Sequence, residues 1–247
     1  MAELTGTASS AQRVKPLFFV WISVYCCFLA FGGFTPTYFA PISVGSLREV
    51  TPLVHIHGFL FFGWTLILLT QTWLTAHGKI ANHRTLGLAG ISLATAMAIT
   101  GLIVSAQFNG GFIAGDEQSR GYQGLLNGWS AMAIFGTFFT LAIANVRRPE
   151  YHKRWIVLAT CAILSAAVSR LYLPLFDFEP VPRWLVYLTV DSIIVACLIN
   201  DWRVLGRPHV VTVIGGTVLL SSQMFRGFIG DTETWRTIAD SLIRIGG

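Results

Sequence analysis

The sequence contains six histidines. Histidine is the residue type with the most possible chemical roles, because imidazole binds haem iron and other metals and titrates near physiological pH. Two of them, His83 in "NHRTLG" and His152 in "YHKRW", precede long apolar runs and have basic neighbours. We predict that His83 and His152, with Arg84, bind one b-type haem or a quinone at one end of a helical bundle. The alternative is that both imidazoles contact lipid phosphate groups at a membrane surface.

A second group of polar residues lies in the apolar segment that begins at Pro52. His57, Trp64 and Gln71 are seven residues apart and therefore form one stripe along a helix. His55 lies about 200° around the helix from His57, so the two cannot easily bind one metal. A buried imidazole or amide needs a protein partner. We expect the stripe to face the bundle, with His57 either hydrogen-bonded in the core or beside a polar pocket.

Two ionisable residues, Arg170 and Asp191, lie inside apolar segments, where a charge costs a few kcal/mol and marks a candidate functional site. On adjacent antiparallel helices their depths differ by about 5 Å. Tyr187 lies one turn before Asp191 on the same face. We predict that Arg170 and Asp191 either form a structural ion pair or line an outward-facing polar pocket with His57, Gln71 and Tyr187.

The composition indicates whether these residues lie in a soluble protein or in a membrane protein. The chain has 247 residues, of which 53% are hydrophobic and 12% are charged, whereas a soluble domain carries about 25% charged residues. The bilayer is therefore the expected solvent. The net charge of +5 favours basic cytoplasmic loops over a nucleic-acid partner. Four cysteines lie in apolar stretches without metal-site spacing, so neither a disulfide framework nor a cysteine-bound metal site is predicted: Cys26, Cys27, Cys161 and Cys197.

Seven segments approach the length of about 20 apolar residues that a membrane-spanning helix needs. They cover 16–34, 53–75, 86–107, 123–145, 155–174, 184–202 and 209–228. The sequence predicts an all-α fold, an integral membrane bundle of seven transmembrane helices in one domain (16–228). A cytoplasmic tail over 1–15 precedes it. A short amphipathic tail over 229–247 follows, and its apolar residues Trp235, Ile238, Leu242 and Ile243 are expected on the outer membrane surface.

Loop charges predict the orientation. The loops on one side carry ten basic residues and the loops on the other side carry three. Basic loops stay in the cytoplasm, so the N-terminus is predicted inside and the C-terminus outside. The ten residues are Arg13, Lys15, Lys79, Arg84, Arg147, Arg148, Lys153, Arg154, Arg203 and Arg207.

Several classes of membrane protein are excluded by what the sequence lacks. A retinal protein needs a lysine in its last helix, and the only lysines are Lys15, Lys79 and Lys153, all outside the predicted spans. A two-haem cytochrome needs histidine pairs at both membrane surfaces, and the outer surface offers only His55 and His57 on one helix. The six histidines are also too few and too scattered for a di-iron desaturase.

Over residues 50–175 the chain resembles a large family of bacterial polytopic membrane proteins of unknown function. The resemblance rests on His57, Gln71, "HRTLG" (83–87), "HKRWIVLAT" (152–160) and "SRLY" (169–172). The core is also broadly similar to b-type cytochromes of the ferric-reductase and b561 kind. The family resemblance implies a bacterial inner-membrane location and supports the choice of His57, Gln71, His83, Arg84, His152 and Arg170.

Three functional hypotheses remain open. The first is a redox bundle that binds one haem b or a quinone and works with other membrane redox subunits. The second is a non-enzymatic carrier of protons or small solutes, or an accessory subunit with a structural Arg170–Asp191 pair. The third is a membrane enzyme that acts on lipid, with His57 or Asp191 as the base.

Overall fold

The computed structural model describes residues 17–246, and every regular element in that range is helical. The predicted tail over 1–15 lies outside the described residues. The elements are α1 (Phe18–Phe34), the π-helical turn η1 (Thr35–Phe39), α2 (Ala40–Ser43), α3 (Pro52–Ala76), α4 (Ile80–Ile113), α5 (Gln118–Ala144), α6 (Pro149–Tyr172), the 3-10 turn η2 (Leu173–Phe176), α7 (Arg183–Leu205), α8 (Val210–Ile229) and α9 (Glu233–Gly246). The all-α prediction is confirmed.

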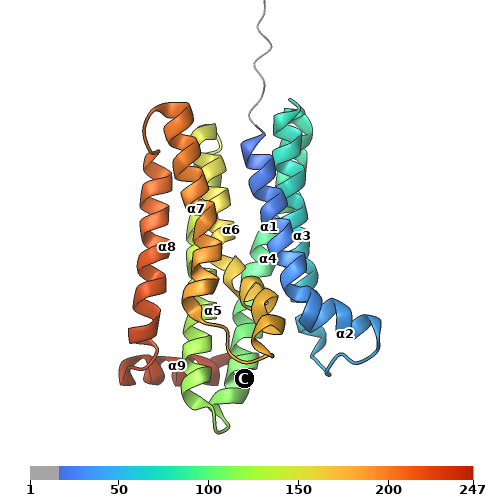
Figure 1. Cartoon of the computed structure of the whole chain (residues 1–247), viewed down its shortest axis with the longest axis vertical. Coiled ribbons are helices and arrows are strands. Elements are labelled where there is room, and N and C mark those ends of the chain that lie inside the picture. The colour runs from blue at the N-terminus through green and yellow to red at the C-terminus, as the bar shows by residue number, and fades with distance from the viewer. Residues whose placement is uncertain (1–16, 247) are drawn as a thin grey trace, which may run out of the picture.

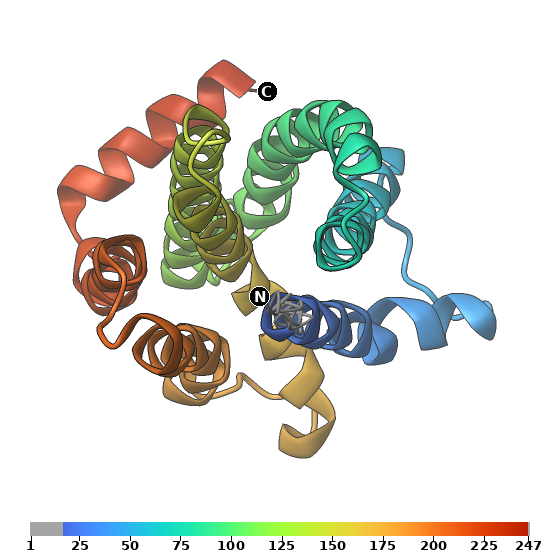
Figure 2. The ribbon, with the colours of Figure 1, turned by 90° about the horizontal axis from the view of Figure 1, so that it is seen from above.

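Seven long helices run side by side, and α9 lies across the end of the bundle opposite the start of α1 (Figure 1). Seen from above, α1, α3, α4, α5 and α6 follow one another around a ring, in which each helix contacts the next (Figure 2). The helices α7 and α8 pack outside this ring against α6, and α8 also touches α5. As a result α6 has neighbours on most sides.

Burial follows this arrangement. In the most apolar part of α6, 56% of the residues are buried, compared with 22–33% in the other apolar helices. Trp64 of α3 reaches across the ring, where its indole Nε1 donates a hydrogen bond to Thr160 Oγ1 of α6 at 3.2 Å. Its ring also packs edge-on against Phe135 and Phe139 of α5. The centre of the ring is therefore filled by aromatic side chains.

Each of the seven predicted segments overlaps one long helix, although the ends of the helices differ from the predicted bounds. Within residues 17–246, six helical segments are long and apolar enough to cross a membrane, and α8 is not among them. At 20 residues α8 has the length to cross, but Arg226, Gln223 and its serines and threonines lower its mean hydropathy. The helix α4 extends six residues beyond the predicted 86–107 at each end, because Gly110 and Gly111 lie inside the helix and do not end it.

The C-terminal tail forms helix α9, which packs on the ends of α4 and α5. Trp235 and Ala239 are buried against Tyr122 and Leu125, and Trp235 Nε1 donates to the carbonyl of Tyr122 at 2.8 Å. Side-chain hydrogen bonds from Gln123 and Ser119 to Asp231 hold the pKa of that carboxyl below its usual range. Ile238 stays 47% exposed. The apolar face of α9 thus lies partly against the bundle.

Candidate functional site

His83 and His152 lie together at the end of the ring where α4 and α6 begin. Their ring centres are 6.3 Å apart and the ring planes are at 88°. His152 Nδ1 bonds to the carbonyl of Ala142 at 2.8 Å, and because a carbonyl only accepts, Nδ1 carries the proton. In the neutral ring Nε2 therefore keeps a free electron pair, the state in which imidazole binds a metal.

Two buried polar atoms without partners accompany this pair. Among the described residues, neither Nδ1 of His83 nor Oε1 of Gln71 has a hydrogen-bond partner. The other amide atom of Gln71, Nε2, donates to the carbonyl of His83 at 3.1 Å, which joins α3 to the first turn of α4. Buried polar groups in proteins are almost always paired, so unpaired ones mark a place for a ligand or water. We call Gln71, His83 and His152 the inner histidine site.

Arg84 does not belong to this site. It follows His83 in the first turn of α4, but its side chain is exposed. Successive helical residues point about 100° apart, so the side chain that follows the half-buried His83 points outward. Arg84 therefore makes no contact with Gln71 or His152 that holds the site together, and its role in binding a cofactor stays a prediction.

The stripe on α3 faces protein along its whole length. His57 is half-buried and its Nδ1 bonds to Thr100 Oγ1 of α4 at 3.0 Å. Trp64 bonds to α6 and Gln71 to the start of α4. His55, on another face, bonds through Nδ1 to the hydroxyl of Tyr38 at 2.7 Å. His57 therefore lies in the α3–α4 contact, where it hydrogen-bonds like a core histidine.

The predicted Arg170–Asp191 pair is wrong, although both residues lie in the described part of the chain. Arg170 Nη1 donates to the carbonyl of Ala166 at 2.7 Å, and its guanidinium lies 4.8 Å from the ring centre of Phe34 on α1. Asp191 Oδ1 accepts from Gln223 Nε2 of α8 at 2.9 Å. Similar depth did not bring them together, because Arg170 points toward α1 and Asp191 toward α8.

The residues of the predicted polar pocket also lie apart, because they face different helices. His57 lies between α3 and α4, and Gln71 lies near the opposite end of α3 beside His83. Tyr187 of α7 lines a small cavity between α6, α7 and α8. No single pocket joins these residues within the described range.

The structure contains a buried ion pair that the sequence interpretation placed among loop charges. Arg154 of α6 is 2% exposed and Asp201 of α7 is 1% exposed. The guanidinium bonds to Asp201 Oδ1 through Nε at 2.9 Å and also through Nη2. The other oxygen of Asp201 accepts from Thr212 Oγ1 at 2.6 Å and from the backbone of His209 at 3.2 Å. This network joins α6, α7 and α8.

Arg226 of α8 is a second buried charge that sequence reasoning missed. It falls inside the predicted 209–228 span, and an ionisable residue within a span is the signal that identifies it. It is 8% exposed.

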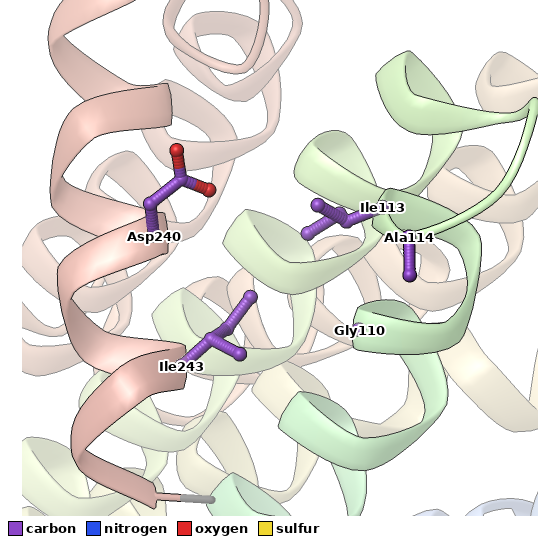
Figure 3. Close-up of a pocket in the computed structure, with 5 residues that line it drawn as sticks. All are labelled: Gly110, Ile113, Ala114, Asp240 and Ile243. Carbon is purple, nitrogen blue, oxygen red and sulfur yellow. The ribbon is translucent and has the colours of Figure 1, made fainter.

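A larger cavity lies outside all of these sites, between α9 and the end of α4 (Figure 3). Its volume is about 320 Å³, and it is open to the surface. Asp240 and Ile243 of α9 face Ile113, the last residue of α4, and Ala114, which follows it, across the cavity. Asp240 already accepts a hydrogen bond from the Tyr122 hydroxyl at 2.8 Å. None of the sequence-predicted site residues lines this cavity.

The fold and the inner histidine site together define a class of protein. The chain is a helical bundle whose six long apolar helices indicate a multi-pass membrane protein, with a histidine pair at one end of its ring. No protein-family model, no curated protein and no solved structure matches the chain. The resemblance to the bacterial polytopic family therefore stays a prediction from the residues.

Proposed function

We propose that this chain is a seven-span protein of the bacterial inner membrane, N-terminus inside, that binds one haem b through His83 and His152. The observation that carries the proposal is the geometry of the two rings. Their centres are 6.3 Å apart, so His83 and His152 would be close enough to hold one haem iron between them, as pairs of histidines do in b-type cytochromes. Perpendicular ring planes are compatible with this, because both planes can contain the line that joins the centres.

The side chains available as metal ligands also limit which metal or cofactor this site suits. The described residues contain no cluster of three or more His, Cys, Asp or Glu side chains that could hold a metal. Two imidazoles alone therefore suit an iron whose other ligands come from a porphyrin. A haem bound here would supply one-electron redox chemistry.

The chain's own groups prepare the two ligands. The hydrogen bond from His152 Nδ1 to Ala142 fixes the tautomer and the ring orientation, as the outer partners of ligating histidines do. The hydrogen bond from Gln71 to the His83 carbonyl holds the first turn of α4 against α3. Both ligands thus come from helix starts that are fixed to neighbouring helices.

A quinone is the second candidate ligand for the same site. Within residues 17–246, Gln71 Oε1 is a buried acceptor without a partner, and His83 Nδ1 is a buried nitrogen without one. A hydroquinone hydroxyl would donate to the former, and a quinone carbonyl would accept from the latter if Nδ1 is protonated. Neither interaction needs Arg84, which is exposed.

Absorption spectroscopy tests the proposal. Protein expressed with haem supply and purified in detergent is measured oxidised and after dithionite reduction. We expect a Soret band that shifts on reduction and is lost in His83→Ala and in His152→Ala. The matched control is His77→Ala, an exposed histidine at the same end of the bundle, which should keep the band. A folded protein without a Soret band, or a band that survives both substitutions, would overturn haem binding, and bound quinone in a solvent extract would then favour the second ligand.

A further inference from the structure

The open cavity between α9 and the end of α4 is separate from the inner histidine site and is large enough for a ligand. Its volume of about 320 Å³ is at the lower end of the range for small-molecule pockets, about 300–1,000 Å³. An added Cβ at Gly110, in its wall, would have no atom within 4 Å. Among the described residues the lining is apolar apart from one carboxylate (Figure 3): Gly110, Ile113, Ala114, Ile243 and Asp240.

The carboxylate of Asp240 is held at the cavity with one oxygen available. The Tyr122 hydroxyl donates to Asp240 Oδ1 at 2.8 Å. No side chain that the structure describes donates to the other oxygen, Oδ2. Hydrogen bonds to a carboxylate are strongest when the donor is itself charged. The carboxylate and its apolar surroundings therefore suit a primary ammonium group that is joined to an apolar body.

Arg236 adds a positive charge beside this carboxylate. It lies one turn before Asp240 on the same face of α9. Its guanidinium is 5.5 Å from the ring centre of Tyr122, and within the described chain its buried Nε has no hydrogen-bond partner. Arg236 and Asp240 form no ion pair with each other. A simple cation would be repelled by Arg236, whereas a zwitterion can turn its negative group toward Arg236 and its ammonium toward Asp240.

The position of the cavity along α4 indicates a membrane lipid. The helix has 34 residues and is therefore about 51 Å long, which exceeds the about 40–45 Å of a bilayer with its headgroups. Gly110 and Ile113 lie in its last turn, at the level of the headgroups and beyond the hydrocarbon. Exposed apolar side chains continue from there toward the middle of α4: Phe108, Ile103 and Ile99. This surface suits acyl chains.

We propose that this cavity binds one zwitterionic phospholipid whose headgroup ends in a primary ammonium, the chemistry of phosphatidylethanolamine. The ammonium donates to Asp240 in the cavity, and the phosphate faces Arg236. The acyl chains lie along the exposed apolar residues of α4. The site requires only that the chain lies in a membrane, and it does not depend on a haem or a quinone at the inner histidine site.

Thermal unfolding with two lipids tests this site. The full chain in detergent micelles is titrated with phosphatidylethanolamine or with phosphatidylcholine that has the same acyl chains. Phosphatidylcholine carries the same phosphate, but its trimethylammonium has no N–H donor. We expect phosphatidylethanolamine to raise the unfolding midpoint by roughly 5 °C at a hundredfold excess over Kd, and phosphatidylcholine to raise it much less.

A carboxylate variant and a matched control assign this difference to the cavity. Asp240→Asn keeps the size of the side chain and removes its charge, so the two lipids should then have the same effect. The control is Glu117→Gln, because Glu117 is an exposed acid at the same end of the bundle, pairs with Arg120 at 2.7 Å and does not line the cavity. This variant should keep the difference between the lipids.

A second variant keeps the test decisive if Asp240→Asn does not fold. Gly110→Leu places a large apolar side chain in the open space beside Gly110 and leaves both charges in place. It should also remove the difference between the two lipids, because the cavity is then filled. Equal rises with both lipids in the wild type, or a difference that persists undiminished in either folded variant, would overturn the site.

Discussion

At the residue scale, a buried ion pair links α6, α7 and α8. Arg154 and Asp201 satisfy each other, and Thr212 and the backbone of His209 complete the acceptor capacity of the carboxylate. Arg154 also bonds to the carboxylate of the half-exposed Glu150 at 2.6 Å. The pair therefore joins three helices with few polar atoms left unpaired.

Breaking this pair one partner at a time should be worse than removing both. We expect Arg154→Met and Asp201→Leu each to lower the free energy of unfolding by about 3–5 kcal/mol, because the first leaves the buried Asp201 without a charge partner and the second leaves Arg154 with only the half-exposed Glu150. The double variant should lose less than either single one. Denaturant unfolding in detergent micelles measures all three, and a double loss equal to the sum of the singles would contradict the interpretation.

Lys153 provides the control for this cycle. It precedes Arg154 and pairs with Glu150 at 2.7 Å, but 32% of its side chain and 50% of that of Glu150 are exposed. Exposed pairs contribute about 0–1 kcal/mol. Lys153→Met should therefore change the free energy of unfolding by less than about 1 kcal/mol.

At the scale of elements, glycines set how closely the ring helices approach. A Cβ on Gly33 of α1 would lie 2.1 Å from the carbonyl oxygen of Ala167 on α6. A Cβ on Gly124 of α5 would meet the Asn109 side chain of α4 at 1.9 Å. Both distances require something to shift: at Gly124 the end of the Asn109 side chain can turn away, whereas at Gly33 the near atoms are backbone, so the close approach of α1 and α6 depends on the missing Cβ.

A pair of glycine substitutions separates close packing from helix propensity. Gly33→Ala forces backbone atoms of α1 and α6 apart and should cost about 1–3 kcal/mol. Gly110→Ala lies inside α4 with no atom near its Cβ position, so it should stabilise by about 0.5–1 kcal/mol through lower chain entropy. Unfolding free energies in detergent measure both. If the two variants behave alike, close approach at Gly33 is not what matters.

At the scale of the whole molecule, the number of long helices decides whether the two ends of the chain lie at the same end of the bundle or at opposite ends. The start of α1 and the helix α9 are at opposite ends of the bundle, because seven long helices run along it (Figure 1). Only six helical segments of the described range are apolar enough to cross a membrane by composition. The polar side chains of Arg226 and Thr212 on α8 are buried, and the exposed face of this helix is mainly apolar, with Val213, Ile214 and Phe228 among its exposed residues.

Reporter fusions test the topology. We expect a phosphatase that is active only outside the cytoplasm to be active when fused after α9. The same enzyme should be inactive when fused at Gly206, between α7 and α8, since basic loops stay inside. Equal activity at both positions would mean that α8 does not cross.

The sequence alone determines the helical class, the approximate positions of the long helices and the presence of histidines at the starts of α4 and α6. It does so because burial of twenty apolar residues and the helical period are local properties of the chain. The predicted pairing of His83 with His152 needed only two helix starts at the same end of the bundle. The structure places their ring centres 6.3 Å apart.

Only the tertiary structure decides which helix each polar face meets. Arg170 and Asp191 have nearly equal depth, yet one contacts Phe34 of α1 and the other Gln223 of α8. Arg154 and Asp201 lie among basic and acidic residues that look like loop charges, yet both are buried. The helical period gives a residue's angle around its own axis, whereas its partner depends on how whole helices rotate and pack, which is a property of the complete bundle.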